Sequence, residues 1–189
     1  MDILKEKIRE HGILISDNVL KVDSFLNHQL DPDLIVAVGQ EFAARFVNDG
    51  VTKILTVEAS GIAVALTTAM ELKLPCVFAK KNKPSTLEGD VYSSVVYSFT
   101  KNETVTISVA SSYIDHTDRI LIIDDFLAMG AASKGLIDIV EQSGAELIGV
   151  GVVIEKGFQK GGKDLRESGV RVESLVTVKS LAAGKVEFE

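Results

Sequence analysis

The chain has 189 residues, of which 46% are hydrophobic and 25% are charged, an ordinary composition for one globular domain with a sizeable core. It contains no run of 18 or more apolar residues, and its first residues carry both charge signs, so neither a transmembrane helix nor a signal peptide is predicted. The formal net charge of −7 argues against a general nucleic-acid binder, although local lysines can still form an anion site.

Cysteine and histidine usage is sparse. The single cysteine, Cys76, lies in an apolar run, so we expect a buried thiol in a reducing compartment and a cytoplasmic protein. The three histidines have no ligand spacing among themselves or with Cys76, so no structural metal site is predicted.

The N-terminal part predicts two helices joined by short extended pieces. Residues 2–11 place apolar side chains on one side of a helix that Gly12 ends, and extended segments follow at 13–15 and 19–22. Residues 23–29 show no clean periodicity. Asp31 and Pro32 then supply the N-cap and first residue of a second helix, whose apolar stripe ends before 48–50. That stripe consists of Ile35, Val38, Phe42 and Phe46.

A first β-α-β unit is predicted over residues 54–79. A strand at 54–57 leads into a polar turn at 58–61, and an Ala-rich helix at 62–73 is apolar enough to be buried. Pro75 is expected to stop this helix before a strand at 76–79. Because parallel strands need such crossovers, the pattern predicts a parallel sheet.

A basic segment and a β-hairpin come next. Residues 80–86 predict an exposed loop, which is either a solvated connector or, because it directly follows a strand, an anion-binding segment around 80–83. Apolar residues alternate at Val95, Tyr97 and Phe99 and again at 105, 107 and 109, with a turn at 100–103. This predicts a hairpin with one apolar face, which is a candidate for a moving lid.

The most informative stretch spans residues 119–133. A buried strand at 120–123 precedes Asp124 and Asp125, and a run of small residues then leads into a helix over about 131–142. Backbone N–H groups at a helix start can bind a phosphate, whereas two carboxylates suit sugar hydroxyls or a hydrated Mg²⁺. A sugar phosphate with a diol, a metal ion and a 5′-phosphate fits all these parts. The residues of the small run are Ala128, Met129, Gly130, Ala131, Ala132 and Ser133.

Two other interpretations of this stretch are weaker. A strand ending in two acids also resembles a Walker B pattern, but the best Walker A candidate, GFQKGGK at 157–163, is followed by Asp164 instead of Ser or Thr and lies after the acids. A purely structural role, with an Asp ending the strand, does not explain two adjacent acids together with the small run.

The remaining chain predicts a central strand and a late strand. Residues 147–154 are very apolar, 155–163 predict a flexible basic loop, and 164–169 predict about one helical turn. A late strand is expected over 170–178, and the tail closes at 181–188.

Residues 119–133 resemble the phosphoribosyl-diphosphate (PRPP) motif of type I phosphoribosyltransferases. The common ending of that motif is Gly-Gly-Thr, whereas here Gly130 is followed by Ala131, Ala132 and Ser133. If the second Gly of the family needs a positive φ, Ala131 would be strained by about 1–2 kcal/mol.

The resemblance implies a role for each strand-end segment, and these segments should meet at one edge of the sheet. The small run would hold the 5′-phosphate, and Asp124 and Asp125 would hold the ribose diol, with Asp125 stabilising the cationic ribosyl centre. Ser60 and Gly61 would offer donors to the diphosphate. Lys80 and Lys81 would neutralise its charge together with Mg²⁺ bound through PRPP. The hairpin at 91–109 would exclude water.

The base pocket is predicted after the central strand. Lys156 could donate to a purine carbonyl oxygen and Phe158 could stack on the ring, although an ordinary loop lysine and a core phenylalanine are equally compatible with the residues alone. A donor here favours 6-oxopurines over adenine.

Several segments across the chain resemble the bacterial xanthine phosphoribosyltransferase family, namely 20–29, 58–61, 96–101, the central motif and 154–158. The resemblance implies that Leu20 and Asn27 line the base pocket and that Lys156 contacts the base. It also implies one domain with the α/β type I phosphoribosyltransferase fold. A parallel sheet core at about 36–154 is then flanked by helices, with a hairpin lid and a small hood from about 1–35 and 155–189.

The implied activity is transfer of the 5-phosphoribosyl group from PRPP to N9 of xanthine, which gives xanthosine 5′-monophosphate and diphosphate in purine salvage. The implied protein is a cytoplasmic homodimer with no metal ligands of its own. Open alternatives are a phosphoribosyltransferase for guanine, hypoxanthine or adenine, and a non-catalytic PRPP-sensing regulator. A DNA-binding module is not expected, because only about 30 residues precede the first long helix and the chain is acidic.

Overall fold

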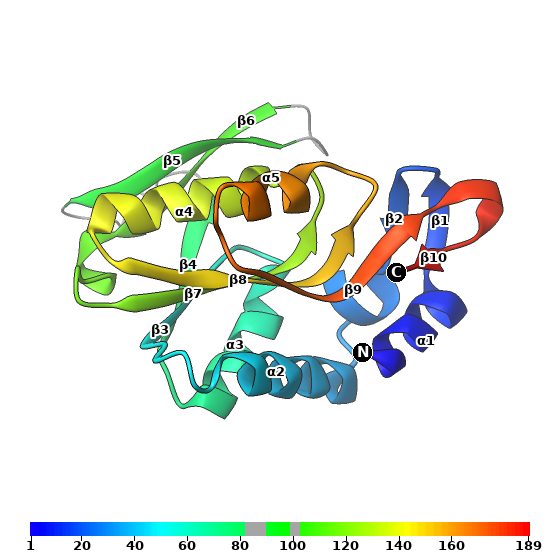
Figure 1. The fold of residues 1–189 in the computed structure, drawn as a ribbon, viewed down its shortest axis with the longest axis horizontal. Helices are drawn as coiled ribbons and strands as arrows, with labels where there is room; N and C mark the ends of the chain where they lie inside the picture. The colour runs from blue at the N-terminus through cyan, green and yellow to red at the C-terminus, as the bar shows by residue number, and fades with distance from the viewer. Residues whose placement is uncertain (82–89, 99–102) are drawn as a thin grey trace.

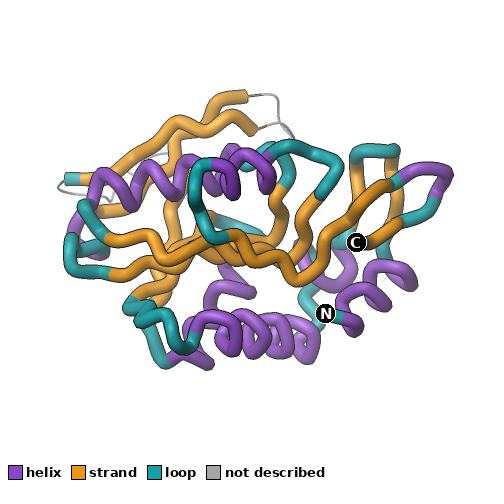
Figure 2. Tube along the Cα trace, in the orientation of Figure 1, coloured by secondary structure: helices purple, strands orange, loops and turns teal. Residues whose placement is uncertain are grey.

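The computed structural model describes residues 1–81, 90–98 and 103–189, and these form helices packed on both faces of a large sheet (Figures 1 and 2). The helices are α1 (Asp2–His11), α2 (Pro32–Phe46), α3 (Gly61–Leu72), α4 (Ala131–Ser143) and α5 (Gly161–Glu167), with a π-helical turn η1 (Asp23–Asn27) and 3₁₀ turns η2 (Ser111–Tyr113) and η3 (Ala182–Gly184). The strands are β1 (Ile13–Ser16), β2 (Val19–Lys21), β3 (Lys53–Val57), β4 (Cys76–Lys81), β5 (Val91–Ser98), β6 (Glu103–Ala110), β7 (Arg119–Leu127), β8 (Glu146–Lys156), β9 (Val172–Ser180) and β10 (Glu187–Phe188).

The large sheet has the strand order β10-β9-β8-β7-β3-β4-β6-β5. The five strands from β9 to β4 pair in parallel, and the antiparallel strands β10, β6 and β5 extend the sheet at its two edges. The predicted parallel sheet core flanked by helices is therefore confirmed.

Two apolar clusters hold the layers together. Helices α2 and α3 cover one face of the sheet, and α4 and α5 cover the other (Figure 1). The first cluster joins α2, α3 and the N-terminal segment to the sheet and includes all four residues of the predicted α2 stripe. The second lies between the sheet and α4 and includes Leu136, Ile139 and Val140, which confirms the predicted inward side of α4.

Helix boundaries follow the predicted caps. Asp31 Oδ1 accepts a hydrogen bond from Leu34 N at 3.2 Å, and Gly12 follows the last residue of α1. Helix α3 ends at Leu72, three residues before Pro75, and its C-cap Lys73 adopts the left-handed conformation with φ of 57°. The predicted end of this helix near residue 73, ahead of Pro75, agrees with the structure to within one residue.

Three strands run further than predicted, and α5 begins earlier. Each strand end keeps a backbone partner, in β6, β8 and β9 respectively, although it starts with polar residues. The loop after β8 is therefore only 157–160, and the predictions of a loop over 155–163 and a helical turn from 164 were wrong. The strand residues added at these ends are Lys80 and Lys81 in β4, Asp124, Asp125, Phe126 and Leu127 in β7, and Glu155 and Lys156 in β8.

The predicted hairpin is present, but its apolar face was assigned to the wrong residues of β5. Val95 is 69% exposed and Tyr97 is also exposed. Val96 instead pairs with Val105 and packs so closely on α4 that a Cβ on Gly135 would clash with it. Since valines occupy both 95 and 96, alternation alone could not fix the buried side. The predicted turn at 100–103 included Glu103, which begins β6 instead. Residues 99–102, and residues 82–86 of the predicted exposed loop, lie outside the described residues.

Helix α3 and Cys76 are less buried than predicted. Leu66 is 50% exposed and Met70 is 67% exposed, because the chain covers only the side of α3 that faces the sheet and α2. Cys76 is half-buried, and this burial raises the pKa of its thiol to about 11.

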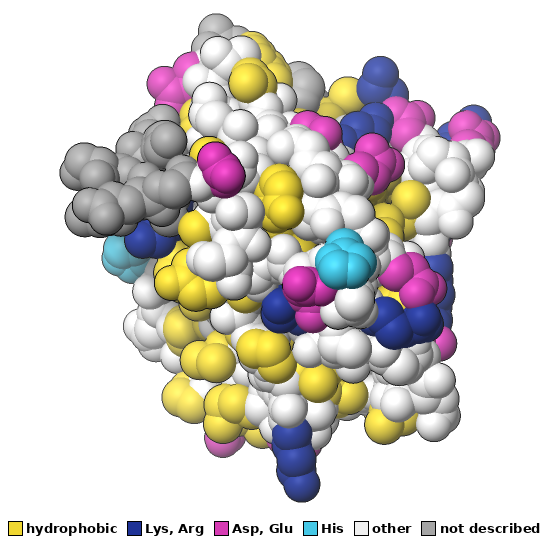
Figure 3. Space-filling view, turned by 90° about the vertical axis from the view of Figure 1, so that its left-hand side faces the viewer, with side chains coloured by type: hydrophobic (Ala, Val, Ile, Leu, Met, Phe, Trp, Pro, Cys, Tyr) yellow, Lys and Arg dark blue, Asp and Glu magenta, His cyan; other side chains and the backbone are white. Residues whose placement is uncertain are grey.

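The N-terminal segment packs against the C-terminal segment at one end of the molecule (Figure 1). The amino group of Met1 donates to Leu175 O at 3.2 Å, and Lys5 Nζ donates to Glu189 O at 3.0 Å. The other end of the molecule mixes acidic, basic and hydrophobic side chains (Figure 3). Among the described helices, none is long and apolar enough to cross a bilayer.

Candidate active site

Four polar segments meet at one edge of the sheet. Strands β4, β3, β7 and β8 are neighbours in that order and all run in the same direction, so their carboxyl ends share an edge. The segments 58–61, 80–81, 124–133 and 156–158 therefore converge there, as predicted. Lys83, the last residue of the predicted basic segment 80–83, lies outside the described residues.

The two acids form a buried pair. Asp124 is 4% exposed and Asp125 is 8% exposed, and Asp124 Oδ1 accepts a hydrogen bond from the Asp125 amide at 3.0 Å. Burial and the neighbouring carboxylate raise the pKa of Asp124 well above its usual range, and the positive charge of Lys81 opposes this only in part. A pair of this kind is stabilised by hydroxyl donors or by a cation.

Helix α3 begins directly beside this pair. A Cβ on Gly61 would contact Thr56 Oγ1 and would lie 2.7 Å from Asp124 Oδ1, so the close approach requires glycine. Thr56 Oγ1 is buried and has no hydrogen-bond partner within the described ranges. The sequence analysis missed Thr56, although a threonine inside the apolar strand 53–57 was a signal for it.

The turn before α3 is tied to the end of β4. Glu58 accepts a hydrogen bond from the Lys81 amide through its carboxylate, and the Glu58–Ala59 peptide bond is cis. Ser60 is the N-cap of α3, and its side chain makes no capping hydrogen bond to the described part of the chain. The structure thus brings Ser60, Gly61 and the exposed Lys81 to the side of the acid pair.

The small run forms a loop and the first turn of α4. Gly130 takes a φ of 80° as N-cap, whereas Ala131 is already the first helical residue, so the strain considered for Ala131 does not arise. No side chain of the described residues caps α4, which leaves the amide groups of its first turn available to an anion. Ala128 and Met129 complete the loop, and Ala132 and the buried Ser133 lie in that first turn.

Lys156, which was predicted to contact a base, is the last residue of β8. Its Nζ donates to Asn18 O at 2.8 Å and lies 5.7 Å from the centroid of the Phe126 ring. Burial lowers the pKa of Lys156. Since Asn18 belongs to the turn between β1 and β2, this contact joins the N-terminal segment to the end of β8.

The other residues predicted to bind the base, apart from Asn27, belong to or pack against the first apolar cluster described above, which joins α2, α3 and the N-terminal segment to the sheet. Leu20 is buried in it, and the half-buried Phe158 packs against it, as does Phe126. Asn27 is the last residue of η1, and its Oδ1 is buried without a hydrogen-bond partner among the residues described. Gln159 Oε1 is in the same situation. Phe126 and Gln159 were missed, because the predicted strand stopped at 123 and the predicted loop gave Gln159 no distinct position.

The acid pair is the part of the site best suited to a metal ion. Among the described residues, no group of three or more His, Cys, Asp or Glu side chains could hold a metal ion alone. Two carboxylates nevertheless match the usual share that protein side chains contribute to Mg²⁺ when ligand phosphates fill the rest of its shell.

The fold resembles solved adenine phosphoribosyltransferases. The enzyme from Thermoanaerobacter pseudethanolicus superposes with a TM-score of 0.77 at 21% identity, over 92% of this chain and 99% of that one. The enzyme from Trypanosoma brucei, solved with AMP, pyrophosphate and ribose-5-phosphate, gives 0.75 at 22% identity, over 92% of this chain and 79% of that one. At these identities the likeness shows the fold alone.

Sequence relatives are much closer. No family model matches the chain. Proteins named xanthine phosphoribosyltransferase are 61% identical in Moorella thermoacetica, 56% in Stutzerimonas stutzeri and 54% in Bacillus licheniformis. Each match spans 188 residues and the whole of this chain, and covers 96%, 99% and 97% of the respective relative. On this full-length similarity, the chain belongs to the xanthine phosphoribosyltransferase family.

Proposed function

We propose that the protein transfers the 5-phosphoribosyl group of PRPP to N9 of xanthine and releases diphosphate. The observation that carries this proposal is the buried pair Asp124 and Asp125, followed within a few residues by the uncapped first turn of α4. The acids would hold the diol of one sugar phosphate, and the amides would hold its phosphate. Membership of the family supplies the acceptor class.

PRPP binding is assigned to residues from three elements. The 5′-phosphate lies on the amides of residues 128–133, and the ribose hydroxyls donate to Asp124 and Asp125. Ser60 and Gly61 offer backbone N–H groups to the diphosphate beside the ammonium group of Lys81. Each group is placed to meet a charge or hydroxyl that PRPP carries in its ground state.

In the reaction, N9 forms a bond to C1 of the ribose as the bond from C1 to the diphosphate oxygen breaks, and N9 loses its proton. Positive charge develops on the ribosyl ring between these events. Asp125 is assigned to stabilise that charge, and the low exposure of the acid pair would strengthen the interaction. The remaining catalysis comes from holding the two substrates in line and excluding water. Closure of the 91–109 hairpin over the site is part of this proposal.

The base is assigned to the pocket between β8 and the N-terminal segment. Lys156 exchanges its hydrogen bond to the Asn18 carbonyl for one to a xanthine oxygen, and Asn27 uses its unpaired Oδ1 to accept from a ring N–H. Leu20 and Phe158 supply apolar contact. The hood, taken as about 1–35 and 155–189 around a core of 36–154, forms this pocket.

Magnesium bound through PRPP fits the acid pair, because two adjacent buried carboxylates are oxygen ligands of the kind that Mg²⁺ prefers. When bound, the ion neutralises the diphosphate and improves it as a leaving group. Asp124 and Asp125 orient the diol whether they contact the ion directly or through water.

We propose a cytoplasmic homodimer. The single half-buried Cys76 suits a reducing compartment. The exposed Leu66 and Met70 lie one turn apart on α3, which carries no charged residue from Gly61 to Met70, and such a helix side is typical of a subunit contact.

The first test is nucleotide formation from PRPP and Mg²⁺ with xanthine, guanine, hypoxanthine or adenine, each supplied alone. Preference for xanthine is the expected result. Preference for another base would keep the PRPP site and reject the proposed base pocket. PRPP binding without turnover of any base would favour a PRPP-sensing regulator.

A further inference from the structure

Helix α5 packs directly against the loop that precedes α4. The amide of Gly161, the first residue of α5, donates a hydrogen bond to Ala128 O at 3.1 Å. Gly161 is buried, and its Cα lies close to Gly130 in the same loop. Helix α5 therefore packs against the backbone of the proposed phosphate loop, although it follows that loop by about 30 residues in the sequence.

This contact tolerates no side chain on Gly161. A Cβ there would lie 2.6 Å from both Gly130 N and Met129 C, and it would also contact Ala128 O. These are backbone atoms of the loop, so they cannot swing aside as the end of a side chain can. Any larger residue at 161 must displace the loop or α5.

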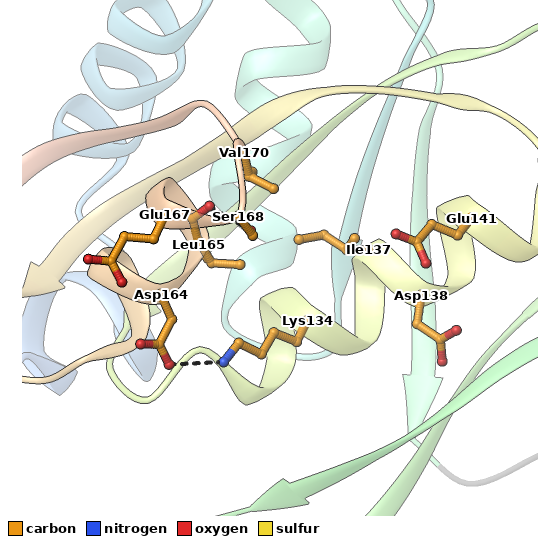
Figure 4. Close-up of a pocket in the computed structure, with 9 residues that line it drawn as sticks. All are labelled: Lys134, Ile137, Asp138, Glu141, Asp164, Leu165, Glu167, Ser168 and Val170. Atoms are coloured by element: carbon orange, nitrogen blue, oxygen red, sulfur yellow. Dashed lines mark hydrogen bonds and ion pairs between the residues drawn. The ribbon is translucent and has the colours of Figure 1, made fainter.

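Helix α5 is itself anchored to other elements. Arg166 donates to both carboxylate oxygens of Glu155 in β8 at 2.8 and 2.6 Å, and Ser174 of β9 donates to the same carboxylate. Lys134 of α4 pairs with Asp164 of α5 at 3.2 Å (Figure 4). With α5 fixed to its neighbours, the loop gives way when Gly161 is enlarged.

We propose that Gly161 is a positioning residue. It holds the 128–130 loop in the position at which the first-turn amides of α4 can bind the 5′-phosphate of PRPP. The identity of this ligand rests on the proposed function. Because Glu155 directly precedes Lys156, the ion pair between Arg166 and Glu155 also links α5 to the proposed base pocket.

Gly161→Ala tests the proposal. The Kd values for PRPP and ribose 5-phosphate, measured by calorimetry, and the KM for PRPP are expected to rise about 10- to 100-fold, as a sub-ångström to 1 Å displacement of a binding group predicts. The KM for xanthine should change less than about threefold, because the three atoms nearest to a Cβ at 161 all belong to the 128–130 loop. Equal increases in both KM values would indicate general damage and overturn the assignment.

Gly149→Ala is the matched control. Its Cβ would lie 3.0 Å from Arg171 O and 3.2 Å from Phe46 Cε1, near the start of β8 and away from the site. We expect a lower Tm with unchanged Kd for PRPP. If Gly149→Ala weakens PRPP binding as much as Gly161→Ala does, the effect is one of stability and the positioning role is refuted.

A measurement on the unaltered protein covers the case in which Gly161→Ala does not fold. Saturation with ribose 5-phosphate should slow amide hydrogen exchange in 128–133 and in α5 together. If ribose 5-phosphate slows exchange only in 128–133 and not in α5, the proposed positioning role of Gly161 is refuted. Absence of any binding of PRPP or ribose 5-phosphate by the unaltered protein would instead refute the proposed function, so the two failures are distinguishable.

Discussion

At the scale of single residues, Asp124 is held in an environment that disfavours its charge. Burial and the adjacent Asp125 carboxylate both raise the pKa of Asp124, and the neighbouring Thr56 hydroxyl has no partner within the described ranges. Such local cost is typical of a binding site that is completed by its ligand. The free protein therefore trades stability for the ability to bind a diol.

Asp124→Asn is expected to stabilise the unliganded protein. A native carboxyl with a raised pKa binds its proton more tightly than the unfolded chain, so the stability of the wild type falls as pH rises from the unfolded value toward the raised one. Asparagine removes this loss, and we expect the free energy of unfolding at pH 8 to increase by about 0.5–2 kcal/mol, measured by urea denaturation. The gain should shrink toward pH 4, and PRPP binding should weaken. A gain that persists unchanged in acid would contradict this explanation.

Asp125→Asn is expected to reduce turnover. Loss of a buried charge aimed at the developing ribosyl cation should lower kcat by about 10²–10³-fold in the xanthine assay. Asp138→Asn provides the control, because Asp138 is an exposed acid of α4 and should leave kcat within about twofold. Unchanged turnover in Asp125→Asn would remove the assigned catalytic role.

The residues of the site that could be predicted were those with a chemical signature of their own. Two adjacent acids before a run of small residues identified 124–133 without any structure. Thr56 left only a weak signal, a threonine inside an apolar strand, and the positions of Phe126 and Gly161 matter only through what lies next to them in space. For Gly161 the relevant neighbour is the backbone of Met129 and Gly130, and no pattern in the sequence encodes that contact.

At the scale of elements, a buried ion pair joins α5 to the sheet, in addition to the apolar packing of Leu165. Burial alone would raise the pKa of Glu155, but hydrogen bonds from Arg166 and Ser174 outweigh burial and lower that pKa. The carboxylate of Glu155 is almost fully buried, whereas Arg166 is partly exposed. Removal of the arginine would leave Ser174 as the remaining side-chain hydrogen-bond donor to this buried carboxylate among the described residues.

Arg166→Met is therefore expected to destabilise the protein by about 1–3 kcal/mol at pH 7. Since the native pKa of Glu155 is lowered, its contribution is fully present above the unfolded value and is lost as pH falls through the native one. Urea denaturation should show a smaller difference between variant and wild type near pH 3 than at pH 7. Lys163→Met, which removes an exposed pair with Glu167 on the same helix, should change stability by less than about 0.5 kcal/mol. An equal effect of both variants would rule out the buried pair as the anchor.

The elements were predicted well in their interiors and poorly at the ends that build the site. Hydrophobic patterns report burial in the core, so they located β7 and β8 but stopped before Asp124 and Glu155. The strands continue because backbone pairing with a neighbour does not depend on apolar side chains. In β5 the same pattern failed for another reason, since Val95 and Val96 allow either side to be buried.

At the scale of the whole molecule, the dimer proposed above places its contact on the exposed side of α3. Leu66→Glu combined with Met70→Glu should convert the proposed dimer to a monomer in sedimentation velocity, because each charge would be buried in the contact. Val47→Glu is the control, since Val47 is also exposed but lies beyond the end of α2. A wild type that sediments as a monomer at micromolar concentration would refute the dimer.

The pairing of the two terminal segments has a consequence for biosynthesis. The hydrogen bonds from Met1 and Lys5 span 174 and 184 positions of sequence, whereas β3 to β8 associate through nearby crossovers. Contacts this distant form late, because loop closure precedes any gain from them. During translation the contacts of the N-terminal segment with β9 must therefore wait until β9 has emerged from the ribosome. Chaperone capture of nascent chains should accordingly be strongest before residue 180 is exposed, and the base pocket should be the last part of the protein to become functional.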